Sequence, residues 1–561
     1  MVTPNGKLKG DRMNKRPTKG DGHGIDRRQI LQMGAGAALA SMVDGWARAE
    51  IAATAVTPAV KTTNGPIIGL IADGIQTFRG VRYGAPPVGA LRFTPPRKPD
   101  PWKSPAGCLY YGRSAMQLSS GGSAVSFPGD VGPALYQVMD APEDIVRQSE
   151  DCLFLNVWTP QLGSSKQRPV MVWFHGGGFN YGSGAWSVYD GHNLAKNHDV
   201  VVVTVNHRLN AFGYLYLGEA GDPASGNVGM LDLVAVLEWV RDNIGEFGGD
   251  PGNVTIFGQS GGGAKVSAIL AMPAARGLAN RAIIESGPGL RGTTKEAALA
   301  ATKTVMKTLG VLDVKALQEM PADKLLAAAS GGDSGALRWG PVVDGVALNA
   351  HPFDPVAPAQ SAGVPVMIGC TKDEATLYNV GFPWWGKLTD TELVEKLKPQ
   401  FGEKTDKLIA AFRRMRPTDS PSYLYTDVAS SAFAFMGSIT LAERKAAQNA
   451  APVYMYIWEW GAPVDNGIMR APHTMEIPFA FDNVDKGPIL LGSAESTKKL
   501  GRQTSGAWTA FARSGDPNKG SSLGLPHWPA YDAQTRSTMM FDVHSRIEAD
   551  PYGEVRKIMR A

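Results

Sequence analysis

The sequence predicts an α/β fold built on a large, mostly parallel sheet, and three observations support this prediction. Apolar segments at 170–174, 253–257 and 364–369 each have the length and composition of a short buried strand. Each segment runs into a loop of glycine or polar residues, and the second continues into a small-residue helical run at 264–271. Strands that alternate with helices are typical of a parallel sheet. No linker, repeat or low-complexity break divides the chain, which favours one elaborated domain.

The second strand carries the pattern G-x-S-x-G at the point where strand becomes helix. Ser260 lies between Gly258 and Gly262. Such a turn is so sharp that flanking side chains would clash, which glycine avoids. The hydroxyl is then held out at the sheet edge, over a helix N-terminus that favours negative charge. A second match at 520–524 has no strand before it and Pro526 just after it, so the sequence indicates an ordinary loop there.

A serine nucleophile also needs donors for the oxyanion that forms on the attacked carbonyl group. Residues 175–178 read His-Gly-Gly-Gly and follow the first strand directly. Consecutive glycines let backbone N–H groups approach a substrate closely, and this pattern is the usual oxyanion loop of lipases and esterases. We expect the N–H groups of Gly177, Gly178 and Gly261 to hold the oxyanion, and His175 to be a structural hydrogen-bonding residue.

Further segments make the chain from Pro66 to Asp542 similar to the type-B carboxylesterases, the α/β-hydrolase family that includes the cholinesterases. The resemblance implies an α/β-hydrolase fold with insertions that form a gorge over the active site. It also implies serine carboxylic-ester hydrolase activity. The matching segments are 78–93, 101–102, 150–158, 206–209, 227–251, 281–287, 341–345, 508–512, 515–518 and 528–531.

The resemblance places the catalytic acid at Glu374 and the catalytic base at His473. Glu374 lies in the turn beyond the third strand, and the adjacent Asp373 is the alternative acid. His473 opens the segment His-Thr-Met-Glu-Ile-Pro-Phe, where the family carries its catalytic histidine. The chain order Ser260, Glu374, His473 is the order expected of this fold.

Other residues near the triad support it or bear on the substrate. Ser286 and Glu476 resemble residues that support the triad in the family, with an ordinary cap or core hydrogen bond as the alternative for each. Cholinesterases carry an acidic residue just before the nucleophile, where this chain has Gln259, and no tryptophan lies in 116–149 to bind a quaternary ammonium. These departures favour a neutral, fairly bulky ester. Gly261 stands where many relatives have alanine, a difference not expected to harm its N–H donor.

Helical spacing of apolar residues predicts helices over 229–243 and 404–414. The segment 112–149 is rich in Gly, Ser and Pro and is expected to roof the gorge as a soft loop, as in relatives. Six side chains are candidates for lining the pocket, with core packing as the alternative: Trp186, Trp384, Trp385, Phe433, Phe435 and Met436.

The N-terminus predicts export. Arg27 and Arg28 precede an apolar segment at 33–43, and Ala47-Arg-Ala49 supplies small residues at the cleavage positions. The apolar segment is too short to span a membrane, and the paired arginines resemble a twin-arginine signal. A disordered basic tail is the alternative, and Met13 is an alternative translation start. We expect residues 1–49 to be a cleaved signal peptide and 50–561 to form the mature periplasmic or secreted protein.

Cleavage after Ala49 would change the formal charge from +4 to −1, because the leader holds nine Lys or Arg and four Asp or Glu. The mature charge therefore gives no support for nucleic-acid binding. No H-E-x-x-H spacing and no phosphate or dinucleotide loop after a strand occurs, so no metal or cofactor is expected. We expect a monomer or small homo-oligomer that acts on a small-molecule ester without stable membrane insertion.

Two questions stay open at the level of sequence. The first is whether Cys108 and Cys152 form a disulfide, since relatives often bridge the cysteine equivalent to Cys152, which would leave Cys370 as a buried thiol. The second is the acyl acceptor, because an acyltransferase or amidase could use the same triad. A non-catalytic binding protein of this fold would usually lack the serine or the histidine.

Overall fold

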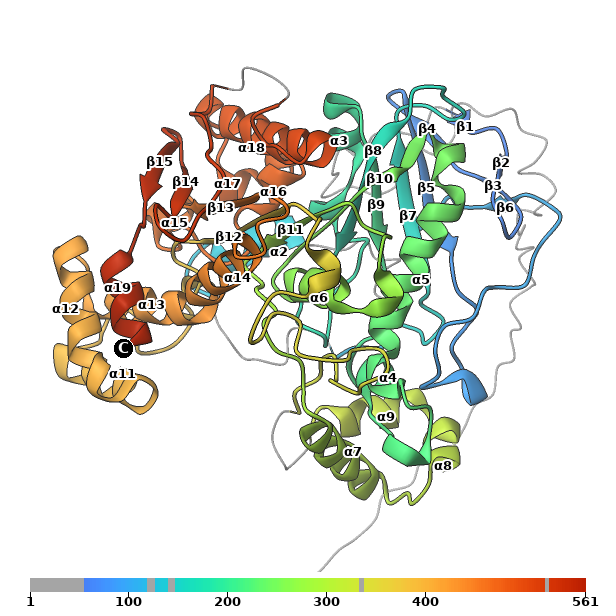
Figure 1. Cartoon of the computed structure of the whole chain (residues 1–561), viewed down its shortest axis with the longest axis horizontal. Coiled ribbons are helices and arrows are strands. Elements are labelled where there is room, and N and C mark those ends of the chain that lie inside the picture. The colour runs from blue at the N-terminus through green and yellow to red at the C-terminus, as the bar shows by residue number, and fades with distance from the viewer. Residues whose placement is uncertain (1–54, 119–126, 140–146, 332–336, 520–523) are drawn as a thin grey trace, which may run out of the picture.

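The computed structural model describes residues 55–118, 127–139, 147–331, 337–519 and 524–561. Its centre is a twelve-stranded sheet (Figure 1). In spatial order the strands are β1 (Ala55–Val56), β4 (Leu70–Ala72), β5 (Ile75–Arg82), β7 (Phe154–Thr159), β9 (Val201–Val205), β8 (Arg168–Phe174), β10 (Gly249–Gln259), β11 (Arg281–Glu285), β12 (Val366–Thr371), β13 (Val453–Trp458), β14 (Ser537–Phe541) and β15 (Arg546–Ala549).

The middle of this sheet is parallel and its two ends are antiparallel. From β9 through β8, β10, β11, β12 and β13 to β14, every neighbouring pair runs parallel. The pairs β1–β4, β4–β5, β5–β7, β7–β9 and β14–β15 are antiparallel. A small second sheet holds β2 (Val60–Lys61), β3 (Pro66–Ile68) and β6 (Ala106–Gly107). The large, mostly parallel sheet is the one that the sequence predicts.

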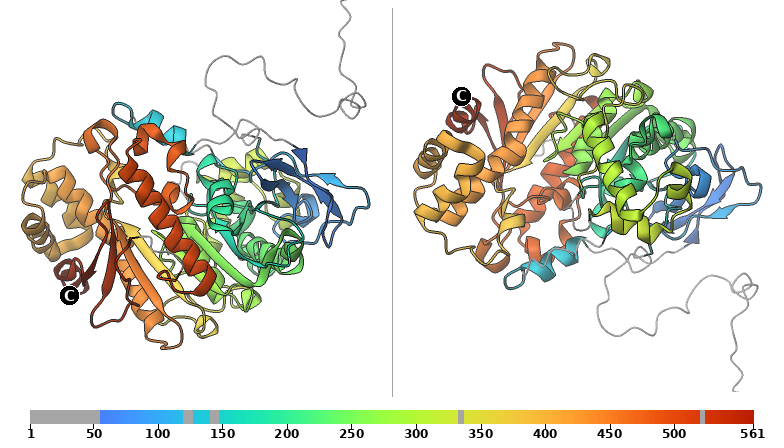
Figure 2. Two further views of the ribbon diagram at one scale, coloured as in Figure 1. Left: turned by 90° about the horizontal axis from the view of Figure 1, so that it is seen from above. Right: turned by 90° about the horizontal axis from the view of Figure 1, so that it is seen from below.

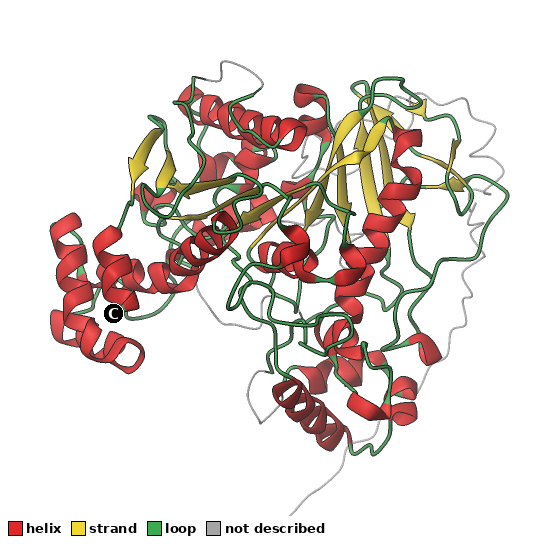
Figure 3. Cartoon of the chain, in the orientation of Figure 1, coloured by secondary structure: helices red, strands yellow, loops and turns green. Residues whose placement is uncertain are grey.

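Helices cover both faces of the sheet (Figure 3). Their bounds are α2 (Val131–Met139), α3 (His192–His198), α4 (Asn210–Tyr214), α5 (Val228–Asn243), α6 (Gly261–Ala271), α7 (Lys295–Leu309), α8 (Val314–Glu319), α9 (Ala322–Ala329), α10 (Thr376–Asn379), α11 (Asp390–Phe401), α12 (Thr405–Met415), α13 (Pro421–Ser430), α14 (Met436–Ala446), α15 (Val464–Gly467), α16 (Ile477–Ala480), α17 (Pro488–Leu491), α18 (Glu495–Ser514) and α19 (Gly553–Arg560).

Strand periodicity divides the buried side chains between two cores. In β8, Val170, Val172 and Phe174 enter one core, whereas Met171 and Trp173 enter the other. This division follows from the alternation of side chains along a strand. The first core is covered by α5, α6 and α14, and the second by α3 and α18. Because both faces are covered, the central strands are continuous apolar runs rather than alternating ones.

The two helices predicted from apolar spacing are confirmed within one residue at each end. α5 turns Leu233, Val236, Leu237 and Val240 toward the first core, which is the i, i+3, i+4, i+7 pattern of an amphipathic helix. α12 packs with α11, α13 and α19 around a separate small core. Figures 1 and 2 show this group of helices at one end of the molecule.

The 112–149 segment differs from the expected soft loop because it contains α2. Val131, Ala134 and Val138 are buried in the second core at helical spacing, and this burial stabilises the helix. Its content of Gly, Ser and Pro concealed that pattern. Residues 119–126 and 140–146 of the segment lie outside the described residues, as do the proposed leader, 1–49, and Ser522 of the second G-x-S-x-G.

The suggested disulfide is not formed. Cys108, Cys152 and Cys370 are all free, buried thiols. Each packs in the first core as a small apolar group, and burial raises the pKa of Cys108 to about 12.

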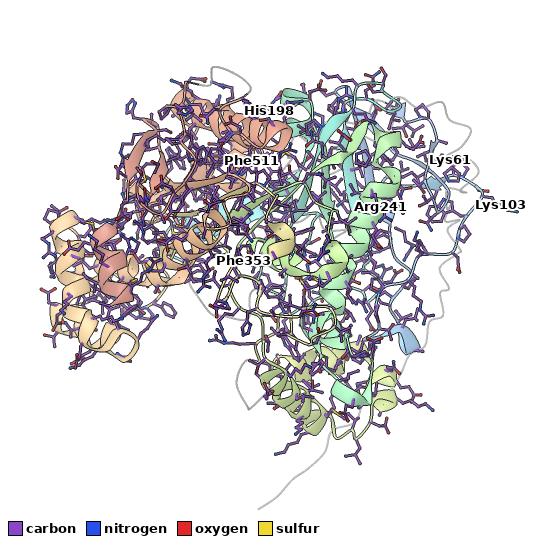
Figure 4. All side chains as sticks on the ribbon, in the orientation of Figure 1. Lys61, Lys103, His198, Arg241, Phe353 and Phe511 are labelled. Atoms are coloured by element: carbon purple, nitrogen blue, oxygen red, sulfur yellow. The ribbon has the colours of Figure 1, made fainter. Side chains whose placement is uncertain are left out.

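His198 is a structural side chain beside α18, and its Nε2 lies 2.9 Å from Ser505 Oγ (Figure 4). No helix in the described part of the chain has the length and hydropathy of a membrane span.

Candidate active site

Loops that follow four adjacent parallel strands bring the predicted site residues to one edge of the sheet. β8, β10, β11 and β12 are neighbours in the sheet. His175 follows β8, Ser260 follows β10, Ser286 follows β11 and Glu374 lies just beyond β12. Parallel strands end at the same edge, so residues far apart in sequence meet there.

The turn at Ser260 has the strained geometry that G-x-S-x-G predicts. Ser260 has φ +58° and ψ −122°, which residues other than glycine rarely adopt. A Cβ at Gly258 would lie 2.6 Å from the carbonyl oxygen of Phe174, and one at Gly262 would lie 2.0 Å from the same atom. Both glycines are therefore required by the end of β8. Ser260 N donates to the Glu285 carbonyl oxygen at 2.8 Å, which ties the turn to β11.

The side chains of Glu374 and His473 form a buried hydrogen-bonded pair. His473 Nδ1 donates to Glu374 Oε2, and the backbone N–H of His473 donates to the Glu374 carbonyl oxygen at 3.3 Å. The other carboxylate oxygen, Oε1, accepts from Thr371 N at 2.8 Å. Both side chains are almost fully shielded from solvent. The carboxylate is thus placed to fix the orientation of the imidazole.

The alternative acid, Asp373, makes different contacts. Its carboxylate accepts from Arg416 Nη1 at 3.1 Å and from Ala471 N at 3.3 Å, and its own N–H donates to the Ala471 carbonyl oxygen at 3.0 Å. Ala471 lies two residues before His473. Asp373 therefore ties the loop that carries Glu374 to the loop that carries His473, and does not itself contact the imidazole.

Gln259 connects the serine turn to the histidine. Its Nε2 lies 3.3 Å from both ring nitrogens of His473. Since Gln259 immediately precedes Ser260, this contact places the imidazole next to the serine turn. The residue that the sequence singles out as neutral in place of an acid is therefore in direct contact with His473.

The His-Gly-Gly-Gly segment, residues 175–178, packs directly on the first turn of α6. Gly177 and Gly178 have φ +82° and +60°, so the loop uses backbone conformations that favour glycine. A Cβ at Gly261 would lie 2.5 Å from Gly178 N and 2.2 Å from Gly178 O. Alanine at 261 therefore does not fit this loop conformation, whereas the glycine of this chain does.

Two buried carboxyl groups, those of Glu476 and Glu285, lie near Glu374. Ser286 Oγ donates to Glu476 Oε1 at 3.0 Å, and Trp508 Nε1 donates to Glu285 Oε1 at 2.7 Å. Burial, together with Glu374 and Glu285, raises the pKa of Glu476 well above its usual range. Burial likewise raises the pKa of Glu285 to about 7. Oε2 of Glu285 and Oε2 of Glu476 accept no hydrogen bond from any described residue, so protonation of these carboxyls avoids two buried, unpartnered charges.

Two aromatic side chains flank His473 and face solvent. The ring centroids of Phe433 and Tyr378 lie 5.2 and 5.7 Å from that of the imidazole, and the two residues are 49% and 43% exposed. Phe433 lies in a π-helical turn, Ser431–Phe435, between α13 and α14, and such turns are frequent at functional sites. Two partly exposed aromatic side chains that carry no charge therefore lie next to the imidazole.

Of the six predicted lining residues, Phe433 lies directly beside His473. Phe435 and Met436 pack in or against the first core, and Trp186 and Trp385 pack against the second. Trp384 stacks on Phe382, with ring centroids 5.8 Å apart. Core packing, the alternative interpretation, therefore holds for most of this set.

Sequence reasoning missed three residues at the site. Tyr378 lies only four residues beyond Glu374, and Glu285 immediately precedes Ser286, so proximity to predicted residues was the available signal. The third is Lys265, a fully buried lysine in α6. The sequence feature that could have revealed it is a single cationic residue within a helix of small and apolar residues. His175, as expected, is structural: its ring stacks on that of His207 with centroids 5.0 Å apart, and its Nδ1 lies 2.9 Å from Gly176 O.

Within the described ranges, no three His, Cys, Asp or Glu side chains are grouped so as to hold a metal ion.

Comparison with known proteins identifies the family. The profile of the Carboxylesterase family matches residues 56–557. The chain is 35% identical to para-nitrobenzyl esterase of Bacillus subtilis over 512 residues, covering 89% of this chain and 97% of that protein. It is 33% identical to phenmedipham hydrolase of Pseudarthrobacter oxydans over 497 residues, covering 86% and 94%.

Solved structures agree with this family. A carboxylesterase of Geobacillus stearothermophilus superposes with a TM-score of 0.77 at 35% identity, covering 89% of this chain and 99% of that one. An esterase from Clostridium hathewayi, described as able to hydrolyse aliphatic aromatic polyesters, gives a TM-score of 0.74 at 32% identity, covering 90% and 98%. The chain therefore belongs to the carboxylesterase family of α/β-hydrolases and is a carboxylic ester hydrolase.

Proposed function

We propose that Ser260, Glu374 and His473 are the catalytic triad and that hydrolysis proceeds through an acyl-enzyme on Ser260. One observation carries the proposal. His473 Nδ1 donates to the buried carboxylate of Glu374, while Gln259, next to Ser260, contacts the same ring. A serine turn, an imidazole and a carboxylate in this arrangement can transfer a proton away from the attacking hydroxyl.

In the first step His473 accepts the proton of Ser260 as the serine oxygen attacks the ester carbonyl carbon. Glu374 holds the ring in the tautomer with the proton on Nδ1 and stabilises the imidazolium that forms. His473 then gives its proton to the departing alcohol. Water repeats the sequence on the acyl-enzyme, which releases the acid and restores the serine.

The backbone N–H groups of Gly177, Gly178 and Gly261 are proposed to hold the oxyanion in both steps. The close packing of Gly178 on Gly261 supports this, because it brings the backbone of the loop next to the first residue of α6. Each such donor is worth about 3–4 kcal/mol of transition-state stabilisation.

The proposed substrate is a neutral, fairly bulky ester. Gln259 adds no negative charge beside His473, and Phe433 and Tyr378 offer ring faces and edges rather than charges. Relatives whose names refer to para-nitrobenzyl esters and to aliphatic aromatic polyesters support the same class.

The test is turnover of p-nitrophenyl esters from acetyl to dodecanoyl by purified residues 50–561. Ser260→Ala is compared with Ser522→Ala, the serine of the second G-x-S-x-G. We expect Ser260→Ala to lose at least about 1,000-fold in kcat and Ser522→Ala to match the wild type. Activity retained in Ser260→Ala would refute the proposed nucleophile. Added alcohol acceptors measure acyl transfer in the same assay.

We also propose that residues 1–49 direct export and are removed after Ala49. The paired Arg27 and Arg28, the apolar segment at 33–43 and the small residues before the cleavage point support this proposal. N-terminal sequencing of the protein from a periplasmic fraction tests it, with Glu50 expected as the first residue. Intact protein confined to the cytoplasm contradicts it.

A further inference from the structure

A buried lysine, Lys265, donates hydrogen bonds to backbone carbonyls of the proposed oxyanion loop. Lys265 lies in α6 and is fully shielded from solvent. Its Nζ donates to the carbonyl oxygens of His175 and Gly178, each at 2.9 Å. It also lies 5.4 Å from the ring centroid of Phe179. The ammonium group therefore contacts the start, the end and the following residue of the His-Gly-Gly-Gly segment.

The two carbonyls that Lys265 bonds, those of His175 and Gly178, flank the peptide groups whose N–H groups are proposed to form the oxyanion hole. The N–H groups of Gly177 and Gly178 belong to the two peptide units that lie between the units carrying His175 O and Gly178 O. The inner carbonyls are also held, since Gly176 O lies 2.9 Å from His175 Nδ1 and Gly177 O accepts from Asn180 N. Fixing every carbonyl of the loop fixes the directions of its N–H groups.

The helix presents Lys265 and Gly261 on the same face. Residues at i and i+4 of a helix are neighbours on its surface. Gly261, which has no side chain, allows the backbone of Gly178 to approach to contact, and Lys265 bonds the carbonyl of that same residue. Close approach and a hydrogen bond thus act together on Gly178.

Ordinary core packing does not account for this lysine. Burial lowers the pKa of Lys265 to about 7, and no carboxylate among the described residues offsets that effect. Burial, followed by the effect of Lys265, also lowers the pKa values of His175 and His207 well below their usual range, so both neighbouring rings are neutral. A buried ammonium without a counter-ion is costly, and an apolar side chain would fill the space at less expense.

We propose that Lys265 is a positioning residue that holds residues 175–179 against α6 so that the N–H groups of Gly177 and Gly178 point at the developing oxyanion. The inference rests on the proposed function. It goes beyond that function by assigning the orientation of the oxyanion hole to one buried side chain.

Lys445 provides a matched control. It is also fully buried, and its Nζ donates to two backbone carbonyls, Ser361 O at 2.9 Å and Ala362 O at 2.8 Å, and to Gln448 Oε1 at 2.9 Å. Lys445 lies in α14, and its backbone bonds hold the turn at Ser361 and Ala362 rather than residues 175–179. Lys265→Met and Lys445→Met therefore each remove two hydrogen bonds from a buried ammonium to backbone carbonyls, and only those of Lys265 concern the oxyanion loop.

The experiment measures kcat, KM and melting temperature of both variants with p-nitrophenyl butyrate. It also measures inhibition by a trifluoromethyl ketone, which forms an oxyanion on the serine, and by the free product acid, which does not. For Lys265→Met we expect kcat to fall about 100-fold, ketone affinity to weaken in parallel, and KM and acid affinity to stay within about threefold. For Lys445→Met we expect a lower melting temperature with kcat within about threefold of the wild type.

Folded Lys265→Met with kcat and ketone affinity within about threefold of the wild type would overturn the inference. If Lys265→Met does not fold, Lys265→Gln, which keeps a shorter N–H donor, is measured in the same way against the same criterion. Failure of the proposed function is a separate result, because it would appear as wild-type turnover that survives Ser260→Ala.

Discussion

The contact between Gly261 and residues 175–178, the proposed oxyanion loop, leads to a specific prediction about Gly261→Ala. An alanine Cβ would lie 2.2 Å from Gly178 O and 2.5 Å from Gly178 N, whereas ordinary contact begins at 3.4 Å. Both atoms are backbone, so no flexible side chain can move away. The variant can fold only if residues 175–179 shift outward from α6.

The size of that shift sets the expected loss. Restoring ordinary contact with Gly178 O requires a displacement of about 1.2 Å. Misplacement of a catalytic group by about 1 Å can cost about 100-fold in rate, which corresponds to about 2.7 kcal/mol in the activation free energy. The helix itself is not weakened, because alanine is a better helix former than glycine by up to about 1 kcal/mol.

The assay is kcat on p-nitrophenyl butyrate, with Gly245→Ala as the control. Gly245 has no atom within 4 Å of a built Cβ and does not use a positive φ. We expect kcat of Gly261→Ala to fall about 100-fold and kcat of Gly245→Ala to stay within about twofold of the wild type. If Gly261→Ala keeps more than about a third of the wild-type kcat, the packing argument is wrong.

Two further predictions concern the carboxyl groups around the site. Asp373→Asn leaves one amide oxygen in place of the two carboxylate oxygens that accept from Arg416 and from Ala471 N, while Arg416 keeps Asp427 as a partner. Urea unfolding should therefore show a loss of about 1–3 kcal/mol, and kcat should fall although Glu374 is intact. Asp390→Asn, whose partner Arg413 is half-exposed, is the control and should lose less than about 1 kcal/mol. Glu285→Gln tests the raised pKa of Glu285: a carboxyl whose folded pKa is about 7 and whose usual value is 4.5 stabilises the fold below pH 4.5 and loses that contribution as the pH rises through about 7. The unfolding free energy of the variant should therefore rise relative to that of the wild type between pH 5 and pH 8, by up to about 3 kcal/mol. A difference between the two that does not change with pH would contradict the assignment.

Much of the fold could be predicted because local pattern and global architecture agree. The strands at 170–174, 253–257 and 364–369 were visible as apolar runs, since a strand covered on both faces has no polar side. The glycines at 258 and 262 could be predicted from the geometry of the turn alone, and the structure supplies the atom that requires them, Phe174 O. Glu374 and His473 depended on the family resemblance, because nothing local distinguishes Glu374 from Asp373.

The parts that sequence could not supply are distances between segments. The contact that requires glycine at 261 comes from Gly178, which is 83 residues earlier in the chain, so the spacing of residues along the sequence could not reveal it. The Cys108–Cys152 pair was open because spacing says nothing about whether two cysteines meet, and both turn out to be separate thiols in one core. Burial of Lys265 was likewise invisible, since lysine is mostly exposed and only tertiary contacts reveal otherwise.

Gly261 packs against Gly178, and Lys265 bonds the carbonyl of the same residue, so substitutions of Gly261 and Lys265 are predicted to be coupled. Both variants displace the same residues, 175–179. Once this loop has moved away from α6, the second substitution should lower kcat little further. Gly261→Ala combined with Lys265→Met should therefore cost about as much in kcat as either single variant, about 100-fold, rather than the roughly 10,000-fold product of independent effects. Lys265→Met combined with Lys445→Met is the reference, because Lys445 bonds Ser361, Ala362 and Gln448 and not residues 175–179. The melting-temperature losses of these two variants should add. A full product of losses in the first pair would mean that Gly261 and Lys265 act on the oxyanion hole independently, and the single-loop account would then be wrong.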